Sequence, residues 1–243
     1  MASKFQLHVL YEDNHLLIVN KPARMLVQGD KTRDKTLIDH CKDYVKEKYN
    51  KPGAVFMGLT HRLDRPVSGV VVMAKTSKAL ERMNKLFHDN KIQKTYWAVV
   101  KKHPPQKRDT LTHWLVKDGT KNVTTAHDSP TDDAKKATLH YRVVGKLNDH
   151  FLLEVKPVTG RPHQIRVQLS AIGSPIKGDV KYGFPKPNVK SDINLHARKL
   201  YFVHPVKNEG LEITASLPEN DFWEQFLSLE TPQVKDKRLD QLF

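Results

Sequence analysis

The sequence has little cysteine, a deficit of acidic residues and no long apolar run. Cys41 is the only cysteine among 243 residues, which excludes an internal disulfide framework and any zinc site built from several thiolates. No apolar stretch approaches the roughly 18 residues that a membrane-spanning helix needs, and residues 1–6 are polar. No linker rich in glycine, serine or proline divides the chain either. These absences predict one domain, residues 1–243, that stays in the cytoplasm and has no membrane partner.

The deficit of acidic residues leaves a large positive charge. The chain has 41 lysine and arginine residues against 27 aspartate and glutamate residues, which gives a formal net charge of +14 and a pI near 9.7. Such an excess is typical of a protein that binds a polyanion such as nucleic acid. Many basic proteins carry only a solvated cationic surface, so charge by itself leaves both interpretations open.

Motifs for metal and nucleotide cofactors are also missing. The sequence has no His-Glu-x-x-His pattern, no acidic cluster beside a pair of its 13 histidines and no glycine-rich phosphate loop. Ser174–Lys177 fits the Ser-x-x-Lys pattern, but its proline falls in a turn after Gly173 rather than at the start of a helix. The sequence therefore predicts no metal site and no cofactor.

Strand and helix periodicities alternate along the chain without an internal repeat. Apolar spacing and turn residues predict a hairpin of 8–11 and 16–19, a helix over 36–49, a strand over 69–75, a helix from Ser77 to Asn90 and a strand over 93–100. Residues 103–137, rich in Pro, Lys, Asp and Thr, predict long loops or a small excursion with one short strand over 111–116.

The second half of the chain returns to regular patterns. It predicts a hairpin of 137–144 and 150–156, a helix from Pro162 to a C-cap at Gly173, strands over 195–203 and 211–215, and a helix over 221–229. Many strands joined as hairpins, with few helices, predict the α+β class. We expect a mixed, mainly antiparallel sheet flanked by helices and loops.

Two polar clusters stand out from this pattern. The first, His61–Gly69, sets the carboxylate of Asp64 among three cations just before an apolar run. The second, Gly160–Leu169, supplies cations without a carboxylate. In the predicted helix the apolar residues share one stripe while Arg166 lies on another, so that the arginine can project from a rigid element. Together the clusters predict two halves of one site for an anionic substrate.

Taken together and in this order, the clusters resemble the signatures of the RluA-like family of RNA pseudouridine synthases. The family's usual wording is His-Arg-Leu-Asp followed by Ser-Gly, and then Gly-Arg-x-His-Gln-Ile-Arg. Further segments are similar to the family in the same order, so that the resemblance covers roughly residues 7–218: 11–15, 19–22, 94–96 and 178–183. The resemblance implies a monomeric catalytic domain without a separate S4 domain, which acts on a uridine flipped out of folded rRNA or tRNA and needs no cofactor.

The implied reaction breaks the bond from uracil N1 to C1′ of the ribose, turns the base over, joins C5 to C1′ and releases the C5 proton. Asp64 matches the family's catalytic aspartate. A carboxylate can attack C1′ or take the 2′ proton, and both routes stay open. Arg166 matches the arginine that pairs with the aspartate and keeps it ionised. Tyr96 matches the tyrosine that stacks on the base and assists removal of the C5 proton.

The other residues of the two clusters are assigned to the RNA. Arg62 matches the arginine that fills the space vacated by the flipped uridine. Substrate binding is further assigned to His61, Leu63, Arg65, Arg161, His163, Gln164, Ile165 and Leu169. His61 could instead be structural. Basic loops at 101–108 and 117–121 are candidates for phosphate contacts.

Other interpretations compete with catalysis. Asp64 could cap a turn or pair with Arg62 or Arg65, as an arbitrary aspartate usually does, but its nine-residue context favours the catalytic role. A catalytically idle RNA-binding module would keep the fold, yet it has no reason to retain a half-buried ion pair of Asp64 and Arg166. A glycosidase shares the anomeric chemistry, but it needs two flanking carboxylates and the Asp64 cluster offers one.

Overall fold

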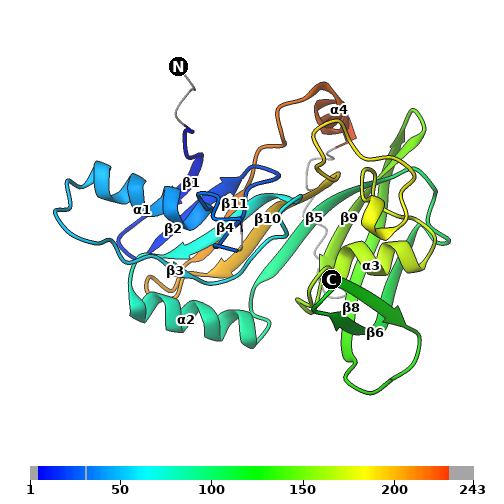
Figure 1. The fold of residues 1–243 in the computed structure, drawn as a ribbon, viewed down its shortest axis with the longest axis horizontal. Coiled ribbons are helices and arrows are strands. Elements are labelled where there is room, and N and C mark those ends of the chain that lie inside the picture. The colour runs from blue at the N-terminus through cyan, green and yellow to red at the C-terminus, as the bar shows by residue number, and fades with distance from the viewer. Residues whose placement is uncertain (1–4, 31, 230–243) are drawn as a thin grey trace. The chain divides into compact units, whose positions relative to one another are not determined.

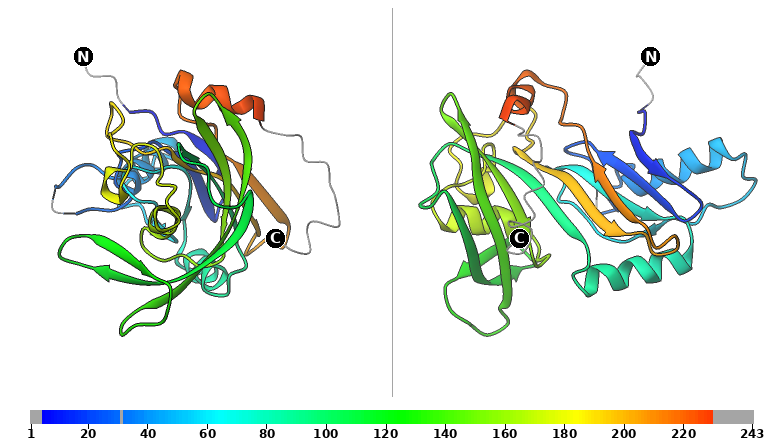
Figure 2. Two further views of the ribbon diagram at one scale, coloured as in Figure 1. Left: turned by 90° about the vertical axis from the view of Figure 1, so that its right-hand side faces the viewer. Right: turned by 180° about the vertical axis from the view of Figure 1, so that it is seen from behind.

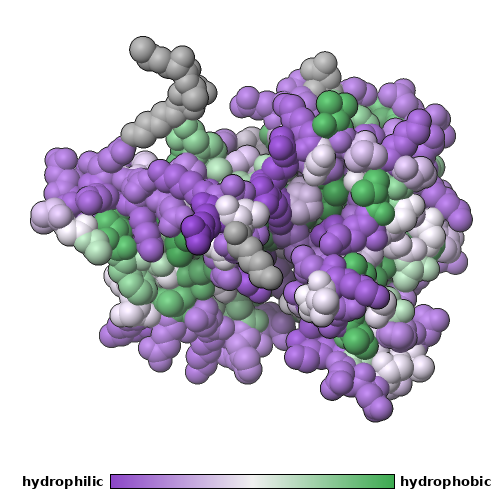
Figure 3. All heavy atoms as spheres, in the orientation of Figure 1, coloured by the Kyte–Doolittle hydropathy of each residue, from purple (hydrophilic) through white to green (hydrophobic). Residues whose placement is uncertain are grey.

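The computed structural model describes residues 5–30 and 32–229 (Figures 1 and 2). They form two compact units, the first from the residues up to Lys94 together with 197–216, and the second from 95–196 together with the residues from Leu217 onward. Within the described ranges no helix is both long and apolar enough to cross a membrane. Hydrophilic residues cover most of the face drawn in Figure 3, in keeping with the 28% of charged residues in the sequence.

The first unit is a sheet with a helix on either side. Its elements are β1 (Val9–Glu12), β2 (Leu16–Lys21), α1 (Leu37–Lys48), β3 (Gly58–Leu59), β4 (Ser68–Ala74), α2 (Ser77–His88), most of β10 (Leu195–Val203) and β11 (Gly210–Thr214). The strands pair in the order β1-β2-β4-β10, with β3 on β4 and β11 on β10. Figures 1 and 2 show α1 and α2 on opposite sides of these strands.

An apolar core fills the space between the strands and α2. Alternate residues of a strand point to the same face, so β2 and β4 each direct every second side chain into this core. Its buried members are Leu16, Ile18, Val70, Val72, Ala74, Ala79, Met83, Ile92, Leu200, Phe202, Ile213 and Ala215. Side chains from the β10–β11 hairpin therefore complete a core that begins near the N-terminus.

Both helices of the first unit begin where the sequence predicts. The Thr36 side chain accepts from the N–H of Asp39, whose side chain accepts from the Thr36 N–H in return, so that the two close a capping box. The Thr76 side chain accepts from the N–H of Ala79 at 3.1 Å. The predicted inward spacing of α1 is confirmed by the burial of Leu37, Cys41 and Val45.

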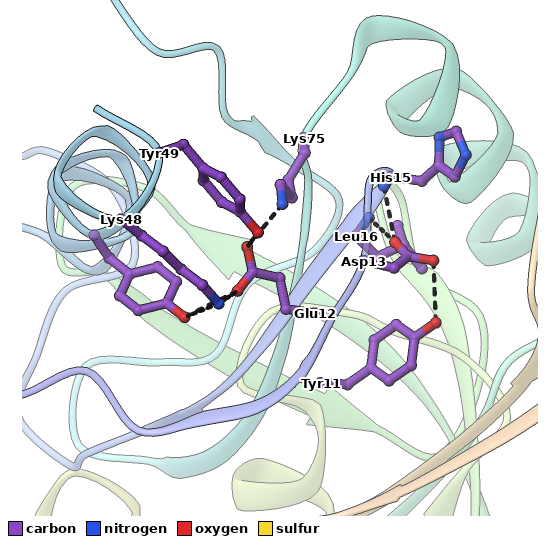
Figure 4. Close-up of polar contacts among 9 residues, drawn as sticks. Tyr11, Glu12, Asp13, His15, Leu16, Lys48, Tyr49 and Lys75 are labelled. Atoms are coloured by element: carbon purple, nitrogen blue, oxygen red, sulfur yellow. Dashed lines mark hydrogen bonds and ion pairs between the residues drawn. The ribbon is translucent and has the colours of Figure 1, made fainter. Parts of the chain in front are cut away.

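The turn between β1 and β2 is tied to α1 through one carboxylate, as Figure 4 shows. Glu12, the last residue of β1, accepts from Lys48 at 2.6 Å and from Tyr44 at 2.9 Å. Its second oxygen accepts from Lys75 at 2.7 Å and from Tyr49 at 2.9 Å. Burial by itself raises the pKa of Glu12, but the four donors outweigh this effect and lower the pKa to about 2. The carboxylate thus joins three segments of the first unit as an anion.

The second unit is built on a longer antiparallel sheet. Its elements are most of β5 (Gln93–Val100), β6 (Arg108–Asp118), β7 (Val123–His127), β8 (Lys135–Leu147), β9 (His150–Pro157), α3 (Gln164–Ala171), a 3₁₀ turn (Val180–Tyr182), α4 (Asp221–Glu224) and a second 3₁₀ turn (Gln225–Leu229). The strands pair in the order β5-β9-β8-β6-β7, with antiparallel registers throughout this path.

The short strand predicted over 111–116 is confirmed as the middle of β6, but the loops predicted over the rest of 103–137 are wrong where the ends of β6, β7 and the start of β8 lie. Leu111 and Leu115 face inward from β6 and alternate with half-buried Thr112 and Trp114, which is the period of two that a strand requires. The inward position between the leucines is His113, which is 7% exposed. Residues 108–110 and 117–118, at the two ends of β6, are polar and exposed, so that the alternation marks only the middle of the strand in the sequence.

The helix predicted from Pro162 begins two residues later than expected. His163 has φ of 54°, in the left-handed region, and therefore cannot be part of the helix that Gln164 begins. The predicted end is confirmed: Gly173 has φ of 77°, and its N–H donates to the carbonyl of Ser170 at 2.9 Å. The predicted helix over 221–229 is α4 followed by a 3₁₀ turn.

The α+β class with a mainly antiparallel sheet is confirmed. The two predicted hairpins, β1–β2 and β8–β9, and the strands β4, β5, β10 and β11 lie where the periodicities place them. That the two compact units act as one catalytic domain stays a prediction.

Candidate active site

Asp64 lies in the loop that joins β3 to β4 in the first unit. The loop turns tightly, because the N–H of Val67 donates to the carbonyl of Asp64 at 3.0 Å. Leu63 and Val67 are buried on either side of the turn, whereas Asp64 is half-buried and Arg62 is exposed. Two apolar anchors thus hold the loop while the carboxylate and the arginine keep access to solvent.

The backbone at Gly69, after the turn, requires a glycine. Its φ is 119°, and a Cβ atom at this position would collide with the backbone of Ala197 in the neighbouring strand β10. Only glycine combines this backbone angle with so close an approach. Gly69 therefore allows the chain to approach β10 closely at the point where the Asp64 loop leads into β4.

Lys21 fixes the same loop from within the first unit. Its side chain is fully buried, and its ammonium donates to the carbonyls of Met25 at 2.9 Å, Pro22 at 3.0 Å and Arg65 at 3.2 Å. Burial lowers the pKa of Lys21 to about 7, the negative charge of Asp64 opposes the change, and the positive charge of Arg65 adds to it. A buried lysine therefore links the end of β2 to the backbone beside the candidate aspartate.

The other members of the first cluster have protein partners of their own. His61 Nε2 accepts from the N–H of Val72 at 3.1 Å, and its ring lies 4.7 Å from the ring of Phe87. Burial, with the nearby charge of Lys94, lowers the pKa of His61 to about 3. Arg65 donates to Asp34 at 2.8 Å and to the carbonyl of Arg24 at 3.1 Å. His61 is thus a neutral acceptor within the fold, and Arg65 joins two surface segments.

Arg166 lies on α3 in the second unit and is buried, 5% exposed. Its Nε donates to Asp179 Oδ2 at 2.7 Å and its Nη2 donates to Asp179 Oδ1 at 2.9 Å. The guanidinium carbon lies 4.9 Å from the centre of the Tyr182 ring. Arg166 is thus directed to Asp179 rather than to solvent, and every residue from Gln164 to Leu169 is buried with it.

The residues around Arg166 hold the start of α3 in place. Gln164 accepts from the Thr159 hydroxyl at 2.8 Å and from the N–H of Arg161 at 2.9 Å, and it donates to the carbonyl of Thr138 at 3.0 Å. His163 Nδ1 lies 2.6 Å from the Tyr182 hydroxyl. Through these contacts Gln164 and His163 stabilise the N-terminal end of α3.

The rest of the second cluster divides between the surface and the core. Arg161 is exposed, and its Nε donates to the carbonyl of Lys136 at 3.2 Å. Ile165 and Leu169 are buried, 7% and 0% exposed. Arg161 is therefore the member of this group that solvent, and hence a large ligand, reaches most easily.

Tyr96 lies on β5 opposite Val155 of β9 and is half-buried. It shares a face of the strand with Ala98 and Val100, as the alternation predicts. Asp64 thus belongs to the first unit, while Tyr96 and Arg166 belong to the second.

Three residues that hold the candidate site residues in place were assigned no role from the sequence: Lys21, Asp179 and Tyr182. Each lies in a segment that resembles the family, 19–22 or 178–183, so the signal was present without an assignment. A lysine at the end of an apolar strand and an aspartate beside a glycine are ordinary in isolation. Among residues 5–30 and 32–229, no group of three histidine, cysteine or carboxylate side chains is placed to bind a metal ion.

Residues 15–171 match the family described as RNA pseudouridylate synthase. This range is more than half of the chain and includes Asp64, Tyr96 and Arg166. The chain therefore belongs to the RNA pseudouridylate synthase family, and the resemblance carried by the two clusters is confirmed. Its class of activity is the isomerisation of uridine in RNA to pseudouridine.

Individual relatives are similar over most of the chain. Ribosomal large subunit pseudouridine synthase D of Zymomonas mobilis is 32% identical over 238 residues, covering 88% of this chain and 70% of the relative. tRNA pseudouridine synthase C of Vibrio parahaemolyticus is 30% identical over 244 residues, covering 92% and 94%. The solved structure of human RNA pseudouridylate synthase domain containing 4 is similar with a TM-score of 0.75 and 25% identity, covering 93% of this chain and 94% of that one.

Proposed function

We propose that this protein converts specific uridines of structured ribosomal or transfer RNA to pseudouridine, with Asp64 as the catalytic carboxylate. The observation that carries the proposal is the family match over residues 15–171, which includes both polar clusters. Relatives named for ribosomal RNA and for transfer RNA are both similar to the chain, so that both kinds of RNA are candidate substrates.

Asp64 suits this role because a backbone hydrogen bond closes its loop and its side chain is only half-buried. A carboxylate fixed at its backbone can meet C1′ or the 2′ proton of a bound uridine without first being ordered.

Arg166 and Tyr96 complete the proposed catalytic set. An arginine within about 4 to 6 Å of a carboxylate keeps it ionised, and its planar fork orients the carboxylate as a lysine would not. Tyr96 offers an aromatic ring for the uracil to stack on and a hydroxyl that can assist removal of the C5 proton. Its place on a paired strand supports the role, because a strand holds a ring more firmly than a loop does.

The target uridine must leave its stack before Asp64 can reach it. Arg62 is exposed and lies two residues from Asp64, which supports its proposed role of filling the vacated space. The remaining residues of the two clusters then shape and line the site: Leu63, Arg65, Arg161, His163, Gln164, Ile165 and Leu169. His61 supports the loop, since its Nε2 already accepts a backbone N–H of β4.

Charge guides the RNA to the site. The net charge of +14 favours association with any polyanion. In the second unit, Lys101 and Lys102 border a surface pocket of about 280 Å³ beside Phe184, where a phosphate can meet ammonium groups and a base can meet an aromatic ring. We further propose that the protein acts in the cytoplasm and that it is a monomer. Size-exclusion chromatography with light scattering will test the monomeric state.

The test of catalysis uses RNA that lacks the modification. Purified protein is incubated with unmodified total tRNA and rRNA, without metal or nucleotide, and pseudouridine is mapped by carbodiimide-dependent stops of reverse transcription. We expect new stops with the wild type and none with Asp64→Asn. The affinity of that variant for RNA should change less than about tenfold, because lysine and arginine dominate binding.

Asp43→Asn is the matched control, because it removes the same charge from an exposed aspartate that pairs with Lys35 on the surface. It should leave the stops unchanged. Full activity of Asp64→Asn contradicts the catalytic assignment. RNA binding without any stops favours the catalytically idle module.

A further inference from the structure

The segment Gly178–Gly183 holds Arg166 from two directions. Asp179 grips one edge of the guanidinium with two hydrogen bonds, 2.7 Å to Nε and 2.9 Å to Nη2. The two side chains are 6% and 1% exposed, so that water does not compete for these bonds. This is the bidentate geometry that an arginine forms with a carboxylate and that a lysine cannot form.

The ring of Tyr182 lies against the guanidinium that Asp179 grips, with the guanidinium carbon 4.9 Å from the ring centre. The ring is itself fixed, because the N–H of Thr124 donates to its hydroxyl at 2.9 Å and His163 Nδ1 lies 2.6 Å from the same oxygen. The hydroxyl of Ser170 donates to the Tyr182 carbonyl at 2.6 Å. Two segments of the second unit, β7 and residues 163–170, thus hold Tyr182 in place.

The backbone of the segment is shaped to present Asp179. The Asp179 carbonyl accepts from the N–H of Tyr182 at 3.1 Å and from the N–H of Phe184 at 3.0 Å. Gly178 has φ of 85°, and a Cβ atom there would collide with the side chain of Asn188. The carboxylate therefore projects from a closed turn that admits only glycine beside it.

A buried ion pair contributes little to stability, because apolar residues of the same volume stabilise a core at least as well. The Arg166–Asp179 pair does, however, fix the orientation of the arginine side chain. It fixes the plane of the guanidinium through Nε and Nη2, so that Nη1 is the nitrogen directed away from Asp179. A guanidinium oriented in advance loses little conformational entropy when it meets another anion.

We propose that Asp179 and Tyr182 are positioning residues for catalysis, because they fix the orientation of the Arg166 guanidinium that the reaction requires. This inference rests on the proposed function, in which Arg166 belongs to the catalytic set. It assigns a role to the segment 178–183, in which Asp179 supplies the orientation and Tyr182 supplies the surface against which the guanidinium lies.

The test compares Asp179→Asn with the wild type in single-turnover reactions, with enzyme in excess over a short RNA that the wild type modifies. Asparagine keeps the size of the side chain but loses the charge and one acceptor. We expect the rate of pseudouridine formation to fall about 10- to 100-fold, as for a misplaced catalytic group, while the Kd for RNA changes less than about threefold. Glu154→Gln is the matched control, because it breaks a 2.8 Å ion pair with Arg142 on the opposite face of the sheet.

A cycle with Arg166→Lys separates positioning from general destabilisation. Lysine cannot form the bidentate pair, so Asp179→Asn should change the rate less than about threefold in that background. The same 10- to 100-fold loss in both backgrounds overturns the proposal, since Asp179 would then act without Arg166. An active wild type with an equally active Asp179→Asn variant also overturns it, whereas an inactive wild type contradicts the proposed function itself.

Tyr182 provides an independent test if Asp179→Asn fails to fold. Tyr182→Phe keeps the ring against the guanidinium, and Tyr182→Leu removes it. We expect the leucine variant to react about 5-fold or more slowly than the phenylalanine variant, in line with the loss of a desolvated cation–π contact. Equal rates in two folded variants contradict the role of the ring.

Discussion

Replacing Lys21 by methionine should remove a pH dependence of stability that this residue gives to the whole protein. The ammonium is fully buried, and its charge is met by three carbonyl oxygens rather than by a carboxylate in contact. Burial therefore lowers the pKa of Lys21 from its usual value of 10.5 to about 7. The folded state thus penalises the charged form that the unfolded chain retains.

The sign of the effect follows from proton counts. Between about pH 7 and pH 10.5 the unfolded chain binds more protons at this residue than the folded protein does, so that the free energy of unfolding rises with pH. Below about pH 7 both states are protonated and the destabilisation is fully present. From about pH 6 to pH 9 the gain is roughly 2.5 kcal/mol, because each pH unit contributes up to about 1.4 kcal/mol.

Urea denaturation followed by tryptophan fluorescence measures this gain. The unfolding free energies of the wild type and of Lys21→Met are determined at several pH values from about 6 to 9, and their difference is plotted. The difference cancels every other titrating group and should rise by roughly 2.5 kcal/mol over this range. Lys91→Met, which changes an exposed lysine, should give a flat difference. Parallel curves for the wild type and Lys21→Met would refute the reasoning.

Two further predictions concern the charged groups of each unit. Four donors hold the pKa of Glu12 at about 2 against the effect of burial. Glu12→Gln should therefore destabilise the protein by about 2 to 3 kcal/mol near pH 7, and by less as pH falls from about 4.5 toward 2, as measured by urea denaturation. An equal loss of stability near pH 3 contradicts this reasoning. The double variant Lys101→Ser/Lys102→Ser should weaken RNA binding and flatten the dependence of log K on log salt by about 1.5 to 2, and an unchanged slope shows that neither lysine contacts phosphate.

The sequence predicts the first unit well because its signals are local. Apolar residues recur at helical spacing in α1, a threonine caps each helix, and the run of valines in β4 is continuous. Each of these signals lies within the element that it specifies. Local chemistry and packing then favour the same structure, which is the condition under which prediction from pattern succeeds.

The second unit is less predictable because its strands are polar on one face and irregular on the other. In β6 the inward position between two leucines is His113, which lies 3.0 Å from buried Gln168 of α3. A histidine that is buried only because a helix residue meets it carries no apolar signal. The partner is 55 residues away, and no local pattern reports it.

The candidate site shows the same division. The sequence predicts roles for Asp64 and Arg166 through compact motifs, but no local pattern indicates that Arg166 is buried. The arginine is buried because Asp179, 13 residues along the chain, neutralises it. Helical periodicity assigns a charged residue to solvent by default, and a tertiary partner reverses that assignment.

The discontinuous first unit has a consequence for synthesis on the ribosome. Its core requires Leu200, Phe202 and Ile213, which the ribosome adds only after residues 95–196 of the second unit. The second unit in turn needs Trp223 and Phe226 for its own core. Nascent chains that end before β10 should therefore lack several residues of this core, and a protease should cleave them more readily than the full chain. Folding of the N-terminal half thus waits for the completion of nearly the whole chain.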